Sequence, residues 1–260
     1  MKKTLAILAT LAAFTGSAMA ADLAPRYSKA PEPVAVAPNW TGFYIFGGVG
    51  GGLWDANTSA FNTATGTCLI CINNKQGGDG WFGTVGAGYD WQFNGRWVAG
   101  ILADGQFGSL KGSESIGGLI FDQKLKDTWA VGARIGYLVA PNVLSYVNGG
   151  YTGSNWSGAT IVSGLTGAPV GAHTNSFSTQ GWFLGGGVEN NLDIFGITAP
   201  GWFVKTEYRG AYYSSKNSDW LNDGTNTLFG VSSTFKPFVQ TISTSLVYRF
   251  NWGGPVVAKY

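Results

Sequence analysis

Apolar and polar residues alternate with a period of two along most of the chain, which indicates β-strands rather than helices. Eight segments show this alternation, and the connections between them are short and long in turn. The expected strands cover residues 41–54, 80–93, 97–108, 125–138, 143–152, 180–191, 202–213 and 237–250. An even number of strands with alternating connections is typical of an up-and-down antiparallel barrel.

The connections give the expected strands a direction. Three are short, at 94–96, 139–142 and 193–201. Four are long and rich in Gly, Ser, Asn and Thr, and we expect these to be loops: 55–79, 109–124, 153–179 and 214–236. In transmembrane barrels the short turns are periplasmic and the long loops are extracellular.

The apolar face of these strands collects its aromatic residues at the two ends, with small or aliphatic residues between them. Two such belts match the two interfaces of a membrane, so the apolar face is expected to contact lipid. The residues expected in the aromatic girdle include Trp81, Trp91, Trp97, Trp129, Trp182, Trp202, Tyr248 and Phe250. We also expect Trp54 in the belt at the long-loop end. The pattern predicts an all-β fold, an eight-stranded antiparallel up-and-down transmembrane β-barrel.

The opposite face carries ionised residues, which we expect to point into the lumen. The expected lumen charge network consists of Asp90, Asp104, Arg134, Glu189, Lys205, Glu207, Arg209 and Arg249. Three of them stand two apart in "KTEYR" and therefore share one strand face. An eight-stranded barrel is only wide enough for side chains to fill, and the glycines on this face, such as Gly86 and Gly88, provide room for them.

Composition and the chain ends divide the chain into four segments. Residues 1–20 have a basic start, an apolar run and an A-x-A site, as in a signal peptide. Residues 21–39 form a Pro/Ala-rich leader, expected in the periplasm, 40–250 the outer-membrane barrel, and 251–260 a C-terminal tail.

Charged residues are 12% of the chain, about half the usual quarter, so much of the surface is not expected to face water. A net charge of +2 gives no reason to expect nucleic acid as a partner.

Residues that could support chemistry are few. Cys68 and Cys71 form a C-x-x-C pair, expected to be a small structural disulfide, with free thiols as the alternative. Zinc would require two more ligands, and the chain has one histidine, His173. His173 with Ser176 or Ser178 is the one candidate for a Ser–His pair. We therefore expect no enzyme, no metal and no cofactor.

Several segments resemble a known family. They are "WTGFYIFGGVGGG", "GYDWQFNGRWVAGILADGQF", "ARIGYLVAPNVLSYVNGGY", "GWFLGGGVE", "WFVKTEYRGAYY" and "LVYRFNWGG". The chain is similar to the small outer-membrane β-barrel proteins of alphaproteobacteria, called outer-membrane immunogenic or porin-family proteins, and more distantly to the OmpA-type barrel. The family often has an acid-x-acid pair on the third strand, where this chain has Leu102 and Asp104. The resemblance implies an eight-stranded barrel in the cell outer membrane.

Three roles are compatible with these observations. The first is a structural or surface protein with a lumen filled by paired charges; the second is a narrow porin or small-solute channel. The third, compatible with both, is binding of an unknown ligand by loops such as 153–179 and 214–236. Expected partners are outer-membrane lipid and lipopolysaccharide. The aromatic Phe250 at the end of the last strand resembles a signal for the outer-membrane assembly machinery.

Overall fold

A computed structural model describes residues 39–250, except for the side chains of 72–76, Glu114 and Ile116. The expected signal peptide, nearly all of the leader and the C-terminal tail lie outside these residues. The described part contains eleven strands and one short 3₁₀ helix, η1. They are β1 (Gly42–Asn62), β2 (Cys68–Phe93), β3 (Trp97–Ile116), β4 (Leu119–Ala140), β5 (Val143–Trp156), β6 (Ala159–Ser163), β7 (Pro169–Thr174), β8 (Phe177–Asn191), η1 (Leu192–Phe195), β9 (Trp202–Tyr213), β10 (Lys216–Asn222) and β11 (Leu228–Arg249).

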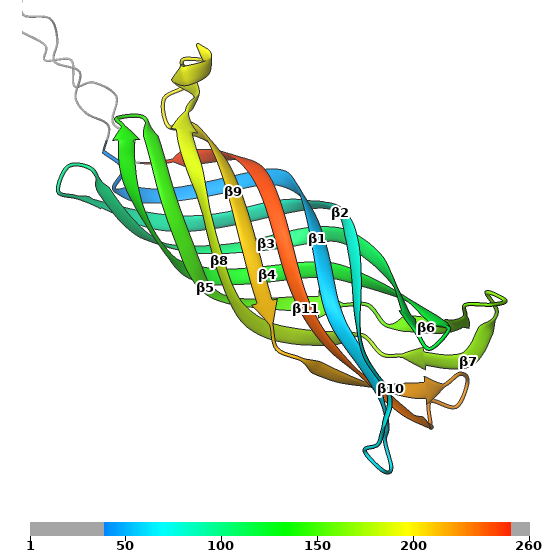
Figure 1. Ribbon diagram of the computed structural model, residues 1–260. Helices are drawn as coiled ribbons and strands as arrows, with labels where there is room; N and C mark the ends of the chain where they lie inside the picture. Colours follow the sequence, from blue (N-terminus) through cyan, green and yellow to red (C-terminus); the bar gives the residue numbers. More distant parts are fainter. Residues whose placement is uncertain (1–38, 251–260) are drawn as a thin grey trace, which may run out of the picture. The chain divides into compact units, whose positions relative to one another are not determined.

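Eight of these strands close into an antiparallel ring. The order is β1–β2–β3–β4–β5–β8–β9–β11, and β11 pairs with β1 to complete it. Neighbours in the ring are also neighbours in sequence, apart from the three short strands β6, β7 and β10 (Figure 1). The predicted all-β, eight-stranded antiparallel up-and-down barrel is confirmed.

The three short strands extend the barrel at one end. There β4 pairs with β6, β6 with β7, β7 with β10, and β10 with β11. They take the place of β5, β8 and β9, so this end is again bounded by eight strands (Figure 1). The expectation of long loops was wrong for most of 55–79, 109–124, 153–179 and 214–236. Only tips such as 63–67, 164–168 and 223–227 are turns or irregular segments.

The other end carries the short turns, as predicted. The β2–β3 turn has positive φ at both Asn94 (47°) and Gly95 (73°). Such a conformation suits Asn-Gly and matches the twist of the two strands that it joins. The β8–β9 connection contains η1, whose N-terminus is capped by the Asn191 side chain and whose C-terminus is followed by Gly196 in the left-handed region.

Three apolar clusters lie inside the barrel, in addition to its charged residues. One includes Trp40, Tyr44 and Phe203, the second includes Trp54 and Trp156, and the third, between β6, β7 and β10, includes Trp220. The prediction that Trp54 belongs to the outer girdle was wrong, because Trp54 is 1% exposed. Inward and outward residues alternate along β1, and Trp54 falls on an inward position, whereas its neighbour Leu53 falls on an outward one.

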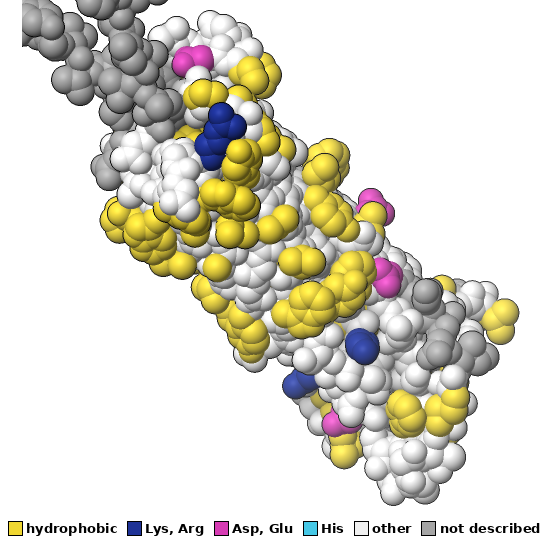
Figure 2. All heavy atoms as spheres, turned by 60° about the vertical axis from the view of Figure 1, so that its left-hand side comes forward, with side chains coloured by type: hydrophobic (Ala, Val, Ile, Leu, Met, Phe, Trp, Pro, Cys, Tyr) yellow, Lys and Arg dark blue, Asp and Glu magenta, His cyan; other side chains and the backbone are white. Residues whose placement is uncertain are grey.

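The outer wall is apolar over a broad band. Val49, Val85 and Ile101 are each more than half exposed, although they lie within long strands. Figure 2 shows hydrophobic side chains gathered over the wall, whereas fewer of them are visible at the end bearing the short strands. An exposed apolar surface of this extent marks contact with another apolar phase. Among the described residues, we find no helix with the length and apolar character required to cross a membrane.

Candidate functional site in the barrel interior

The interior brings together all eight charged residues of the expected network. Each side chain belongs to a residue that is at most 8% exposed: Asp90, Asp104, Arg134, Glu189, Lys205, Glu207, Arg209 and Arg249. Buried charges are tolerated when they are paired and hydrogen-bonded. Here they form two groups of four, each containing two acids and two bases.

The first ion cluster, defined as Asp90, Arg134, Glu189 and Arg249, is a closed ring of four ion pairs. Arg134 contacts Asp90 at 2.5 Å and Glu189 at 3.1 Å. Arg249 contacts the same two carboxylates, each at 2.8 Å. These residues come from β2, β4, β8 and β11, which are every second strand around the ring. Acid and base therefore alternate around the lumen, and each pair joins strands that are a quarter turn apart.

Aromatic rings surround the first ion cluster. The Arg134 guanidinium carbon lies 4.4 Å from the centre of the Tyr44 ring, and that of Arg249 lies 4.4 Å from the Trp40 ring. Arg249 also donates a hydrogen bond to the Trp40 carbonyl at 3.2 Å. These cation–π contacts fill the space beside the charges with apolar groups.

The second ion cluster, defined as Asp104, Lys205, Glu207 and Arg209, crosses the lumen from β3 to β9. Arg209 donates two hydrogen bonds to Asp104, at 2.9 and 2.7 Å, and one to Glu207 at 2.8 Å. Lys205 lies 3.8 Å from Glu207, and its ammonium sits over the Phe46 ring at 3.2 Å. Because β3 and β9 are four places apart in an eight-strand ring, the Arg209–Asp104 pair joins opposite walls.

The neutral partners of these charges were not predicted from the sequence. Tyr146 and Asn148 both donate to the second carboxylate oxygen of Glu207, at 2.8 and 2.9 Å. Both residues lie on the inward phase of β5, alternating with the exposed Val147. The sequence could have indicated this, because Tyr146 and Asn148 alternate in register with Gly150 and Thr152 on the same inward face.

Inward glycines provide the room for these side chains. A Cβ atom at Gly86 or Gly88 would overlap the rings of Phe46 and Tyr44, and one at Gly185 would lie 2.5 Å from Asn148 Oδ1. A Cβ atom at Gly100 would overlap the carboxylate of Asp90. The glycines therefore permit a filled interior, as the narrow barrel requires.

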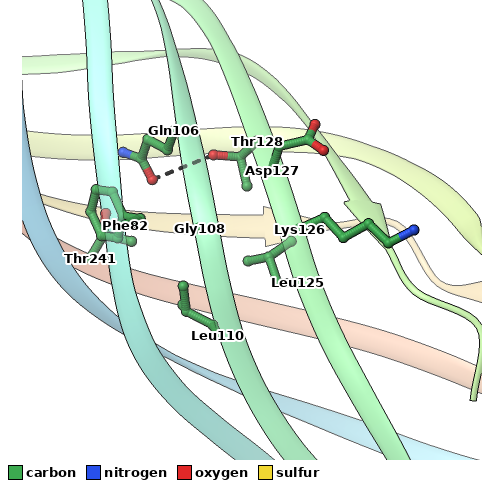
Figure 3. A pocket seen from close by; sticks show the side chains of 9 residues that line it. All are labelled: Phe82, Gln106, Gly108, Leu110, Leu125, Lys126, Asp127, Thr128 and Thr241. Carbon is green, nitrogen blue, oxygen red and sulfur yellow. Dashed lines mark hydrogen bonds between the residues drawn. The ribbon is translucent and has the colours of Figure 1, made fainter.

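Between the ion clusters and the end with the short strands, the interior is also closely packed. A cavity of about 10 Å³ lies between β2, β3, β4 and β11, which is about the space that one water molecule needs. Figure 3 shows its lining residues, with Thr128 donating to Gln106 at 3.4 Å and Lys126 extending away from the cavity.

The residues expected in the aromatic girdle lie on the outer wall. Seven of them are 38–79% exposed, and Tyr248 is partly exposed. The most exposed is Trp81. On the outer wall, aromatic rings from neighbouring strands contact each other in pairs, such as Trp97 with Tyr137 at 5.2 Å between ring centres and Trp182 with Tyr212 at 4.6 Å.

The remaining candidate residues lie at the end with the short strands. Cys68 and Cys71 are joined by a disulfide at the start of β2, where a loop was expected. His173 contacts Asp223 at 2.7 Å, whereas the Ser178 hydroxyl donates to Asn155. The described residues contain no group of three or more His, Cys, Asp or Glu side chains suited to a metal ion.

Comparisons with known proteins agree with this architecture. Residues 6–250 match the family described as outer membrane protein beta-barrel domain. The chain is 32% identical over 253 residues to a 31 kDa outer-membrane immunogenic protein of Brucella melitensis, covering 94% of this chain and 98% of the relative. It is 28% identical over 254 residues to a 25 kDa outer-membrane immunogenic protein of Brucella canis, covering 96% and 99%.

A solved structure shows the same fold. The outer membrane protein OprG from Pseudomonas aeruginosa superimposes with a TM-score of 0.51 at 10% identity, covering 82% of this chain and 99% of that one. The chain therefore belongs to the outer membrane protein β-barrel family and is a protein of the cell outer membrane.

Proposed function

We propose that this protein is a structural and surface component of the outer membrane whose lumen is closed by paired charges. The observation that supports this role is the first ion cluster, in which four strands at quarter turns each contribute one charge. A pore needs a continuous aqueous path, and here paired side chains reach across the barrel. The narrow porin is the weaker candidate for that reason.

Conductance across planar bilayers tests the proposal. The folded protein is reconstituted, with its heat-dependent gel mobility shift as the check on folding and a known porin as the positive control. We expect no stable openings above the background of protein-free membranes. Reproducible single-channel steps from the folded protein would contradict the closed lumen and favour the channel.

We also propose that the outer wall meets lipopolysaccharide near Lys111 and Lys124. These residues face each other directly across β3 and β4, beyond the outward aromatic rings of Phe107 and Trp129. They border a polar hollow of about 410 Å³. Lys111 also stands opposite Asp79 on β2, and Lys124 and Lys111 together present two ammonium donors that a phosphate group could accept from. Weaker co-purification of lipopolysaccharide with Lys111→Gln/Lys124→Gln than with wild type is the expected result.

Recognition by the assembly machinery is proposed to depend on Phe250. Its ring is 56% exposed at the end of β11, and its backbone N–H donates to the Phe43 carbonyl at 3.1 Å. A Phe250→Ser variant is expected to insert more slowly in cells but to fold normally into lipid vesicles. Equal insertion of the variant and the wild type would contradict this role.

We propose no enzymatic activity.

A further inference from the structure

The outer wall has an apolar hollow on strands β1 to β4, near the short-turn end. It is open to the outside of the barrel, and its volume is about 490 Å³. Two alanines, Ala87 and Ala103, stand directly opposite each other on β2 and β3 and form its floor. Larger side chains border it: Phe43, Tyr89, Ile101 and Val131. The hollow exists because small outward residues of two adjacent strands coincide.

A cation lies at the membrane edge of the same wall. Arg96 is exposed in the β2–β3 turn, and its guanidinium donates to the Tyr137 hydroxyl at 3.3 Å. Within the described part of the chain, no carboxylate lies in ion-pair distance of Arg96. Trp97 and Tyr137 place this turn at the level of the aromatic girdle.

The distance between the cation and the hollow can be compared with the membrane. From Trp97 to Ala103 there are six residues of β3, or roughly 20 Å along the strand. With the usual barrel tilt of about 45°, this corresponds to a depth of ~14 Å, nearly half of a ~30 Å hydrocarbon core. A chain that starts at Arg96 would therefore reach the hollow within one leaflet.

We propose that Arg96 and this hollow form a binding site for one phospholipid of the periplasmic leaflet. The lipid phosphate contacts the Arg96 guanidinium, and one acyl chain lies over Ala87 and Ala103. Three observations select this occupant: the hollow is continuous with the lipid-facing band, its lining has no charged side chain, and the Arg96 cation, which complements a phosphate, lies on the same wall at the membrane edge. The leaflet follows from the position of the short turns, which are periplasmic in such barrels.

The strength of such a site is limited. Acyl chains are as apolar as the wall, so the site gains contact surface and one ionic contact rather than a hydrophobic driving force. An exposed ion pair contributes about 0.2–1 kcal/mol, so its loss is expected to weaken binding up to about fivefold.

Native mass spectrometry of the delipidated barrel, with phosphatidylglycerol added, tests the proposal. Ala103→Phe fills the hollow, and Val188→Phe on the outer wall of β8 is its matched control. Arg96→Gln removes the cation, and Lys126→Gln at the other end is its control. Diacylglycerol has acyl chains but no phosphate, so its binding reports on the hollow without the contribution of Arg96. Ala87→Leu replaces Ala103→Phe if that variant lacks the gel mobility shift of a folded barrel.

We expect one retained phosphatidylglycerol per barrel. Filling the hollow should lower this occupancy at least about threefold, and Arg96→Gln should lower it for phosphatidylglycerol but not for diacylglycerol. Both controls should match the wild type. Wild-type occupancy in the folded variant with the filled hollow would overturn the site. Preferential binding of lipid A would assign it to the other leaflet's lipid, and a dimer lost on filling would assign it to a second copy of the chain; either result overturns the proposal.

Discussion

Arg134 of β4 and Asp90 of β2 bind each other through two hydrogen bonds inside the barrel, from Nε to Oδ1 at 2.9 Å and from Nη2 to Oδ2 at 2.5 Å. They are 44 residues apart in sequence and two strands apart in the ring. Arg249 contacts the same carboxylate from the other side. Asp90 is thus held between two guanidinium groups.

Removing the charge of Asp90 should destabilise the barrel. In Asp90→Asn, two buried arginines lose a carboxylate, and breaking a buried pair on one side typically costs about 3–5 kcal/mol. We expect the heat-induced gel mobility shift to occur at a lower temperature. Asp193→Asn, in the exposed turn between β8 and β9, is the control that should behave like the wild type. An unchanged transition in Asp90→Asn would show that the ring of ion pairs contributes little to stability.

Glu207 offers a second test, because charged and neutral donors share its carboxylate. Glu207→Ala leaves Lys205 and Arg209 with fewer partners and removes the acceptor of Tyr146 and Asn148. We expect it to lower the free energy of unfolding by about 3–5 kcal/mol, measured in urea with the barrel in lipid vesicles. Glu207→Gln keeps an acceptor for the neutral donors and should lose less. If the two variants unfold alike, the neutral hydrogen bonds are not part of the network's stability.

Two glycines of β2, one on the inner face and one on the outer face, allow the packing on the two faces to be compared. Gly88→Ala would place a methyl group against Tyr44, and such overpacking typically costs about 1–3 kcal/mol. Gly83→Ala points outward, where its Cβ would have no neighbour closer than 3.9 Å. We expect only the inward substitution to lower the unfolding free energy in vesicles. Equal effects would mean that the interior has room that the packing does not show.

The lipid-facing wall should reject charge at mid-strand. Val85→Arg puts a cation within the apolar band of the outer wall, and at the bilayer midplane such a change costs a barrel about 2–4 kcal/mol. Ser113→Arg lies outward on β3, beyond the aromatic belt, and should cost about 0–1 kcal/mol. Folding yields in vesicles at increasing urea concentration measure both. Comparable stability of the two variants would place Val85 outside the hydrocarbon core.

The sequence predicted the barrel in the region where its two faces meet different media. In "KTEYR" the charged residues Lys205, Glu207 and Arg209 alternate with the outward Thr206 and Tyr208, and the structure places the three charges inside. The same logic located Arg249 from the last strand. Which acid meets which base was not predictable, because those pairs depend on ring order and register.

Prediction failed where both faces of a strand carry similar residues. In β10, "KNSDWLN", and in the first half of β11, the outer face is polar because it lies beyond the apolar band, so alternation weakens. Gly, Ser, Asn and Thr in these segments indicated loops. Trp54 was assigned by its position near the end of an expected strand, although its phase with Gly50 and Gly52 placed it inside.

The continued closure at the far end has a consequence for how the protein is recognised. β2 has 26 residues, more than twice the roughly ten that cross a membrane, and beyond the apolar band it belongs to a stalk whose ring of strands β6, β7 and β10 complete. The stalk carries narrow tips such as 164–168 and 223–227 outward on paired strands. The proposed surface role then predicts that antibodies raised against intact cells bind epitopes assembled from neighbouring strands, and that boiling the protein abolishes most of that binding.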